Sequence, residues 1–312
     1  MRRIALALCL SFLLVGCGQD EAADGNQGAN AASITVEGEG ILMDEQVGEV
    51  TQASETETIQ AGGIAQRTDG VRSAWTDYSQ YAAPDETGYA YYMHADPDIS
   101  SEIFAMDEFQ SQDVLLFTFD DAPNLPESDT LRIAETLKEL DVNAIFLVNG
   151  MYLETEEGRQ IARQVHEMGF ELGNHTFGHP NLRELSYEDQ YFELNRTNEL
   201  IAEVTDGAPV RWMHPPFGLF DMDTILICNE LGMQLMTWSF GYDWMDEYFN
   251  GPQLAEVSLN NDYLRSGANI LMHDLPWTAD AVRDMVNGYR DQGYHIVDPY
   301  LILHQENSLD PL

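Results

Sequence analysis

The sequence has 312 residues, of which 54 are Asp or Glu and 14 are Lys or Arg, so its formal net charge is −40. A chain of this length can bury one large core or two small ones, which excludes a disulfide-stapled mini-protein. A surface this negative repels phosphate, and we therefore expect no nucleic-acid partner. The acidic excess is typical of salt adaptation or high solubility and indicates no specific basic partner.

The first residues have the pattern of an export signal. Positive charges precede an apolar run over Ile4–Val15, which is too short to span a bilayer, and small residues lead to Cys17. Residues 1–16 resemble a bacterial lipoprotein signal, which implies cleavage before Cys17, a lipid on Cys17 and attachment to a membrane of the cell envelope. Gly18 favours the outer membrane over the inner one. The alternative is an ordinary secretory signal with an incidental cysteine. With Cys17 lipidated, Cys228 alone remains and no intrachain disulfide can form.

Two segments of different composition follow. Residues 17–74 contain no Phe, Trp or Tyr and cannot bury enough apolar surface to offset the entropy of ordering. We therefore expect a disordered, lipidated acidic tether. Residues 75–110 contain eight aromatic side chains. We interpret them as an ordered extension packed on the following domain, and their sequence indicates no function.

Residues 111–312 alternate short apolar runs with segments of helical periodicity. The runs have the length of buried strands and lie at 114–119, 144–148, 170–172, 210–213, 234–240, 269–272 and 295–297. Segments whose apolar residues have helical spacing lie between these runs, and Ser128 and Ser186 are the expected N-caps of two of the helices. Strands and helices in alternation predict an α/β domain with a parallel sheet, most simply closed into a barrel.

Polar side chains stand at the carboxyl ends of several runs, which is where parallel barrels carry their active sites. They are Asp120, Asp121, His175, His214, Asp243 and His273. Each has a simpler interpretation by itself, since the two adjacent aspartates suit a turn and His175 and His179 suit a surface loop. Their joint placement favours one shared site.

Five short motifs occur in unbroken order. They are Thr118-Phe-Asp-Asp121, His175-Thr-Phe-Gly-His179, Pro215-Pro-Phe-Gly218, Asp243-Trp244 and Ile270-Leu-Met-His273. In this order they resemble the motifs of polysaccharide deacetylases with the NodB homology domain, carbohydrate esterase family 4, over about residues 113–302. The resemblance implies a distorted seven-stranded (β/α) barrel, in agreement with the seven apolar runs. It does not extend to the tether or the aromatic extension.

One carboxylate and two imidazoles, on Asp121, His175 and His179, make a ligand set that suits a divalent ion, above all Zn²⁺, and leaves a position open for water. Nearby Gly and Pro residues disfavour a helix through the two histidines, so we expect a loop. A divalent ion acidifies water, and Asp120, next to a ligand, is placed to accept its proton as the water attacks an acetyl carbonyl.

Further roles are implied for the remaining motif residues. The leaving amide nitrogen needs a proton, and His273 is the candidate acid, with Asp243 as the carboxylate that orients and charges it. The resemblance implies that the backbone N–H of Phe217 stabilises the oxyanion. It also implies that Trp244 and Ile270 form the groove around the acetyl methyl group, although Trp244 fits a core position equally well.

The sequence departs from the family pattern at His214, because the family usually has an Arg there that holds the catalytic base. His214 can still hydrogen-bond Asp120, whereas Arg211, at an odd offset on the same strand, faces the opposite side. We therefore expect a changed pH dependence or a reduced rate. The fourth motif also lacks an earlier Asp that the family carries.

Two classes of function remain open. The first is a hydrolase of non-peptide carbon–nitrogen bonds, a metal-dependent N-deacetylase of a GlcNAc- or MurNAc-containing polysaccharide, with O-deacetylation of acetylated xylan as a variant. The expected partner is then peptidoglycan, poly-GlcNAc or a chitin-like polymer, and we expect a monomer. The second is a non-catalytic or weakly active glycan-binding lipoprotein on the same fold. Retention of Asp120 and His273 favours the first, because a pure binder needs neither a base nor an acid.

Overall fold

The computed structural model describes Ala82, Pro84 and residues 86–97 and 101–309. The predicted signal, Cys17 and the predicted tether over residues 17–74 lie outside the described residues. Within the described part of the chain, no helix combines the length and the apolar composition that a membrane crossing requires.

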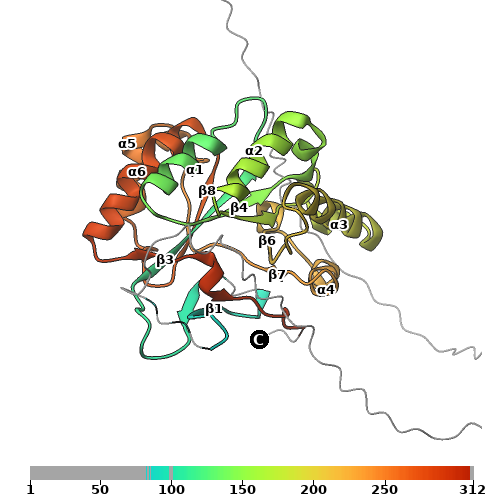
Figure 1. Ribbon diagram of the computed structural model, residues 1–312, viewed down its shortest axis with the longest axis horizontal. Helices are drawn as coiled ribbons and strands as arrows, with labels where there is room; N and C mark the ends of the chain where they lie inside the picture. Colours follow the sequence, from blue (N-terminus) through green and yellow to red (C-terminus); the bar gives the residue numbers. More distant parts are fainter. Residues whose placement is uncertain (1–81, 83, 85, 98–100, 310–312) are drawn as a thin grey trace, which may run out of the picture. The chain divides into compact units, whose positions relative to one another are not determined.

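The described residues form a seven-stranded parallel sheet flanked by helices (Figure 1). The strand order is β7-β6-β5-β4-β3-β8, and β9 pairs with the first residues of β3. The strands are β3 (Val114–Ala122), β4 (Ile145–Val148), β5 (Glu171–Asn174), β6 (Trp212–Met213), β7 (Gln234–Leu235), β8 (Asn269–His273) and β9 (His295–Ile296). The predicted α/β fold with a distorted (β/α) barrel is confirmed.

The predicted strand over residues 234–240 is wrong beyond Leu235. β7 pairs with β6 only over Gln234–Leu235, after which the backbone leaves that edge of the sheet. It then reaches the other edge, where Ser239 N donates to Asn269 O at 2.8 Å and Phe240 forms a parallel bridge to Ile270. The run therefore links the two edges of the barrel, with residues 234–236 and Phe240 buried and residues 237–239 partly buried between them.

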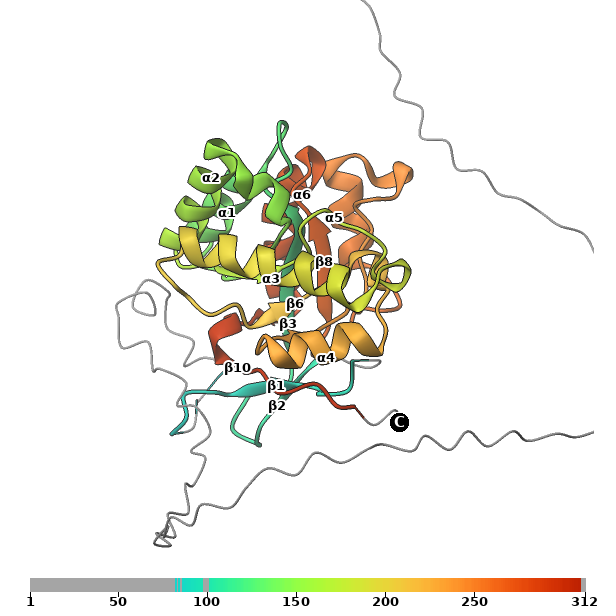
Figure 2. The ribbon, with the colours of Figure 1, turned by 90° about the vertical axis from the view of Figure 1, so that its right-hand side faces the viewer.

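Six helices cover the outside of the sheet in the part of the chain that the structure describes. They are α1 (Thr130–Glu139), α2 (Glu156–Glu167), α3 (Tyr187–Val204), α4 (Met222–Glu230), α5 (Gly251–Leu259) and α6 (Pro276–Asp291). They contact one another in the order α5, α6, α1, α2, α3, α4, which Figures 1 and 2 show as an arc of helices. The cap at Ser186 is confirmed, since its side chain accepts from Asp189 N. α1 starts one residue later than expected, with Asp129 at its N-cap.

Side-chain alternation along β3 separates the core from the site. Leu115, Phe117 and Phe119 belong to the cluster that packs against the helices. Val114 and Leu116 point to the other face and belong to a second apolar cluster. Thr118 and Asp120 continue that second face towards the carboxyl end, and both are buried. The enclosed face of the barrel therefore changes from apolar to polar along one strand.

A small sheet lies at the amino end of the barrel (Figure 2). β1 (Tyr91–Met93) pairs in parallel with β10 (Ile302–Leu303) and antiparallel with β2 (Ile103–Ala105). Ile103 N donates to Gly267 O, just before β8, at 2.8 Å. The described part of the aromatic-rich extension, which includes β1 and β2, thus packs on the end of the barrel opposite to the candidate site.

A buried ion pair fixes the chain's C-terminal segment to this amino end. Arg211 makes two hydrogen bonds to Glu171, at 2.6 and 2.5 Å, and also donates to Ile302 O and Pro299 O, each at 3.1 Å. Both side chains are nearly inaccessible to solvent. Arg211 therefore faces away from Asp120, as its offset predicted.

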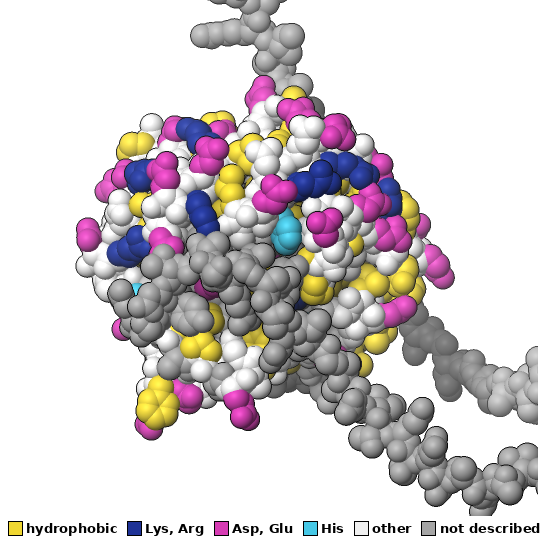
Figure 3. Space-filling view, in the orientation of Figure 1, with side chains coloured by type: hydrophobic (Ala, Val, Ile, Leu, Met, Phe, Trp, Pro, Cys, Tyr) yellow, Lys and Arg dark blue, Asp and Glu magenta, His cyan; other side chains and the backbone are white. Residues whose placement is uncertain are grey.

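The ion pairs at the surface are more exposed. Arg283 pairs with Glu139 at 2.5 Å with about half of each side chain or more in solvent, and Arg196 pairs with Glu154 at 2.6 Å. On the face shown in Figure 3, Lys and Arg side chains lie interspersed with Asp and Glu side chains. Such exposed pairs contribute little to stability.

We expect Arg211→Ala to lower the free energy of unfolding by about 3–5 kcal/mol, because it leaves Glu171 buried without a partner. Arg283→Ala, which breaks an exposed pair, should cost less than about 1 kcal/mol. Urea unfolding of the two variants measures the difference. Equal losses in the two variants would show that the buried pair does not hold the amino end together.

Candidate active site

The predicted polar residues converge at the carboxyl end of the sheet. Asp120, on β3, is the direct neighbour of His273 in the register with β8. His175 and His214 follow the ends of β5 and β6, where Asn174 lies opposite Met213. These neighbours share one edge because the strands are parallel, which is the arrangement expected from the sequence.

The two histidines of the second motif lie in a loop, as expected. The backbone after β5 takes positive φ angles at Thr176 and His179, of 67° and 57°. Asn149 donates from its side chain to His175 O at 2.6 Å, and His179 N donates to Thr176 Oγ1 at 3.0 Å. Gly178 N donates to a Glu193 carboxylate oxygen at 2.7 Å. These bonds fix the loop, so that both imidazoles are held in place before any ligand binds.

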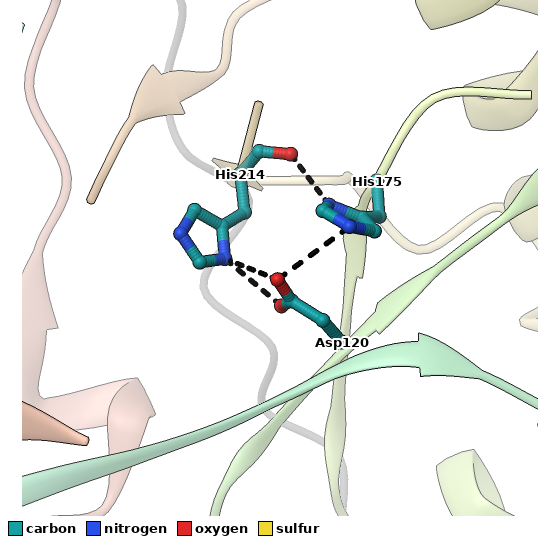
Figure 4. A group of neighbouring side chains, drawn as sticks. All are labelled: Asp120, His175 and His214. Atoms are coloured by element: carbon teal, nitrogen blue, oxygen red, sulfur yellow. Dashed lines mark hydrogen bonds and ion pairs between the residues drawn. The ribbon is translucent and has the colours of Figure 1, made fainter. Parts of the chain in front are cut away.

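One hydrogen bond sets the tautomer of His175. Its Nδ1 lies 2.7 Å from the backbone carbonyl of His214, as Figure 4 shows. A carbonyl only accepts, so Nδ1 must carry the proton and Nε2 presents its lone pair. Burial lowers the pKa of His175, which also favours the neutral ring. His175 is thus prepared to bind a cation through Nε2.

His214 holds Asp120 in the orientation shown in Figure 4. Its Nδ1 lies 2.9 Å from Asp120 Oδ1 and 2.8 Å from Oδ2, and its side chain is fully buried. A carboxylate only accepts, so His214 donates from Nδ1. Burial alone would raise the pKa of Asp120, but the electrostatic attraction of the neighbouring imidazoles and the hydrogen bond from His214 outweigh it and lower the pKa to about 2. Asp120 is therefore ionised at neutral pH.

Asp121, His175 and His179 present three donor atoms to one point. His175 Nε2 and His179 Nε2 each lie 3.7 Å from Asp121 Oδ1. All three donor atoms fit within 4.8 Å of one another, and the set combines buried and partly exposed residues. The lone pair of His175 Nε2 and the carboxylate of Asp121 face each other at this distance, an arrangement that a cation between them would stabilise. The residues present therefore fit a divalent metal.

A second group that could hold a metal shares His175 and consists of Asp120, His175 and His214. Two ligands bound tetrahedrally at 2.0–2.2 Å lie roughly 3.4 Å apart. The separations around Asp121 are close to that value, whereas the 2.8 Å between His214 Nδ1 and Asp120 Oδ2 is a hydrogen-bond distance. The geometry therefore favours the set that contains Asp121.

A separate pair next to Asp120 consists of the buried Asp243 and the partly buried His273. His273 Nδ1 lies 2.8 Å from Asp243 Oδ1, and Asp243 Oδ2 accepts from His273 N and from Thr278 Oγ1. Burial alone would lower the pKa of His273, but the charge and hydrogen bond of Asp243 outweigh it and raise the pKa to about 9. His273 is therefore protonated at neutral pH and can act as an acid.

Aromatic rings surround these polar groups. Trp244 is 43% exposed and its ring centroid lies 5.6 Å from that of His273, so it is a surface residue beside the acid and not a core residue. Phe217 packs edge-on against His179 at 4.7 Å. Trp238 packs against His214 at 4.9 Å, and a Cβ on Gly218 would come within 3.0 Å of its indole ring. Trp238 thus packs against the ring of His214 and helps to bury it.

The expectation that Ile270 lines the site is wrong. Ile270 is 1% exposed, lies opposite Phe117 in the β3–β8 register and belongs to the cluster that faces the helices. Residues on one face of a strand are two apart, so Leu271 shares the face of His273 and Ile270 does not. The residue of this motif that shares the face of the site is thus one position after Ile270.

Two residues of this region were not predicted from the sequence, namely Trp238 and Asp274. Trp238 lies in an aromatic stretch that carries no polar signal. Asp274 follows His273 and is buried, with Oδ2 accepting from Asn124 N, Ser128 Oγ and Thr130 Oγ1 at 2.6–2.8 Å. Burial raises the pKa of Asp274 to about 6. Asp274 holds the loop that follows Asp121. The only signal for it in the sequence was that a second polar residue follows the candidate acid His273.

Comparison with known proteins agrees with this geometry. Residues 108–236 match the family model for polysaccharide deacetylase. The chain is 29% identical over 168 residues to the chitooligosaccharide deacetylase of Azorhizobium caulinodans, covering 53% of this chain and 75% of that protein. It is 31% identical over 193 residues to the peptidoglycan-N-acetylmuramic acid deacetylase PdaC of Bacillus subtilis, covering 60% and 38%.

A solved structure shows the same fold. Wild-type BA3943 of Bacillus anthracis, a carbohydrate esterase family 4 pseudoenzyme, has 28% identity and a TM-score of 0.53, covering 59% of this chain and 63% of that one. A BA3943 mutant with restored enzymatic activity has 30% identity and the same TM-score, covering 59% and 65%.

These matches support a polysaccharide deacetylase domain of the NodB type, in carbohydrate esterase family 4. The family-model match includes Asp120, Asp121, His175, His179 and His214 and ends before Asp243 and His273. The chain spans 62% of the length of an uncharacterized Geobacillus stearothermophilus relative and 38% of PdaC.

We expect the imidazole of His273 to titrate near pH 9 in the metal-free protein. Asp243→Asn removes the charge that holds the proton while burial remains, so the pKa of His273 should fall below the ordinary 6.5 of histidine. NMR titration of the imidazole resonances measures both values. The resonance of His295, at the far end of β3, should not move between the two proteins and serves as the control. A midpoint unaltered by Asp243→Asn would contradict the pairing.

Proposed function

We propose that the protein is a metal-dependent hydrolase that removes N-acetyl groups from a GlcNAc- or MurNAc-containing polysaccharide. The observation that carries this proposal is that one edge of the sheet holds two sets of side chains, one placed to bind a metal and one placed to transfer protons. One carboxylate and two imidazoles converge on a cation position, while a second carboxylate and a protonated histidine stand beside them unused as ligands. The peptidoglycan and chitooligosaccharide deacetylases among the relatives support this substrate class.

Asp121, His175 and His179 would hold the metal, and their nitrogen-rich donor set suits Zn²⁺. A bound divalent ion would supply Lewis acidity, which polarises the acetyl carbonyl and makes water a stronger acid. This help matters because Asp120, with its pKa lowered to about 2, is by itself a weak base.

Asp120 is the proposed base. His214 fixes both of its oxygens from one side, and His175 Nε2 lies 3.5 Å from Oδ2 on another. Asp120 is therefore held ionised and oriented for the proton of the attacking water. The backbone N–H of Phe217 remains the proposed donor to the oxyanion.

His273 is the proposed acid. An amide anion is a very poor leaving group, so the nitrogen must be protonated as the C–N bond breaks. His273 uses Nδ1 to donate to Asp243, which leaves its Nε2–H for the substrate. About a fifth of its side chain is exposed, so a substrate can reach it. Acetate and a free amine on the sugar are the products.

A second candidate function is glycan binding without efficient turnover. The observation in its favour is His214, at a position where the sequence resemblance calls for Arg. An imidazole is a weaker partner for Asp120 than a guanidinium, which is always charged and can donate two parallel hydrogen bonds to a carboxylate. The match to a family pseudoenzyme shows that this fold also occurs without activity.

The proposed location is the cell envelope, with the protein attached by a lipid on Cys17 and the outer membrane favoured by Gly18. The tether would let a membrane-anchored enzyme reach a polymer that lies off the membrane. Its residues are outside the described part of the chain, so this proposal stands on the sequence alone.

We expect one divalent metal per chain. Dialysis against Zn²⁺ followed by metal analysis should give a stoichiometry near one for the wild type and near zero for the His175→Ala, His179→Ala double variant. Zn²⁺ should also raise the melting temperature of the wild type but not that of His179→Ala, because ligand binding stabilises only a folded site. His295→Ala, remote from the site, is the matched control. Undiminished metal in the double variant would contradict the ligand assignment.

The experiment that tests the function is acetate release by the Zn²⁺-loaded protein from peptidoglycan, poly-GlcNAc, chitooligosaccharides and acetylated xylan. We expect release from an N-acetylated polymer, and a loss of about 10²–10⁴-fold in Asp120→Asn, because Asn keeps the shape but accepts no proton. The metal content of Asp120→Asn should be unchanged. No release from any of these polymers would contradict the proposal.

His214→Arg separates the two candidate functions in the same assay. The enzyme proposal expects release by the wild type, preserved or increased by His214→Arg if Trp238 yields space for the longer side chain. The binding proposal expects release only in His214→Arg. Crystal structures or thermal unfolding of the variant establish whether the larger side chain is accommodated.

A further inference from the structure

Apolar side chains are exposed on the loop after β7, beside the proposed acid. Trp244, Met245 and Phe249 are 43%, 40% and 45% exposed within six residues of chain. Trp244 contacts His273 and belongs to the site described above, but Met245 and Phe249 have no role in it. Neighbouring exposed apolar groups on a soluble protein are typical of a surface that a ligand covers.

Phe249 forms part of a two-ring platform with Trp277. The rings stack with centroids 4.2 Å apart and planes 22° apart. Trp277 lies in the first turn of α6, directly after β8, and its indole N–H donates to Asp243 O at 2.7 Å. Asp243 in turn orients His273. The platform is therefore attached to the same backbone that positions the acid.

The loop holds this shape through its own bonds. Met245 N donates to Tyr242 O at 3.1 Å, Tyr248 N donates to Met245 O at 2.8 Å, and the Asn250 side chain caps α5. None of these bonds uses the Phe249 side chain. A surface fixed in advance loses little entropy when a ligand binds, so the platform is suited to recognition.

The chemistry of the platform and its rim points to a sugar ring. A pyranose has apolar C–H faces that stack on aromatic rings and hydroxyl groups around its edge that donate to carboxylates. Asp246 and Glu247 are exposed on the turn between Met245 and Phe249. Their negative charge disfavours an anionic sugar and favours a neutral N-acetyl sugar or an amino sugar.

We propose that Phe249 and Trp277 form a binding subsite for a pyranose of the substrate chain that neighbours the sugar being deacetylated. This inference rests on the proposed function. It adds that the protein recognises a chain of sugars and not a single sugar unit. Trp244 at the acid and the platform beyond it would then contact successive parts of one glycan.

Chain-length dependence tests the subsite. We measure kcat/KM for acetate release from the GlcNAc dimer and pentamer and take their ratio. Phe249→Ala should lower the pentamer-to-dimer ratio about tenfold, while Phe249→Tyr, which keeps the ring, should retain it. Tyr263→Ala, an exposed aromatic after α5, is the matched control and should leave the ratio unchanged. If Phe249→Ala lowers both substrates in proportion, the ring only supports the loop and the proposal is overturned.

A binding measurement separates this inference from the proposed function. Calorimetry with the Zn²⁺-loaded Asp120→Asn protein should show pentamer binding that weakens about tenfold on adding Phe249→Ala and not on adding Tyr263→Ala. This result supports the subsite even if the wild type releases no acetate, in which case only the catalytic proposal fails. Pentamer affinity that is absent, or unaffected by Phe249→Ala, overturns the subsite.

Discussion

The site depends on one residue, His214, which makes two hydrogen bonds from different atoms. Its ring donates to Asp120, and its backbone carbonyl accepts from His175 Nδ1. The first bond orients the carboxylate of Asp120. The second bond fixes the tautomer of His175, so that the lone pair on its Nε2 faces Asp121. Adjacent carboxylates of one strand are thereby assigned to different tasks, with Asp120 free to take a proton and Asp121 free to bind a metal.

The fold makes this assignment possible by placing polar residues at one end of an otherwise apolar barrel. Along β3 the enclosed face changes from Val114 and Leu116 to Thr118 and Asp120. The amino end is sealed by the small sheet and by the buried pair of Arg211 with Glu171. Charged groups can then be buried at the other end, because each one is paired or hydrogen-bonded there.

The sequence predicted the barrel and most of the site because these features depend on local patterns. Apolar runs mark parallel strands, and residues after such runs share one edge, which brought Asp120, His175 and His214 together. It did not predict the path of residues 234–240, because burial alone does not say which strands a run pairs with. Ile270 was misplaced because a run buried on both faces gives no alternation to show which residue faces the site. Trp238 and Trp277 were missed because their roles depend on contacts between distant elements.

The central claim is that Asp121, and not Asp120, binds the metal. The most direct test is a crystal structure of the Zn²⁺-loaded protein, with the metal located by its anomalous scattering. We expect one zinc ion bound by Asp121, His175 and His179, with His214 Nδ1 still donating to an uncoordinated Asp120. A zinc ion bound instead by Asp120, His175 and His214 would contradict it, because no free base would then remain.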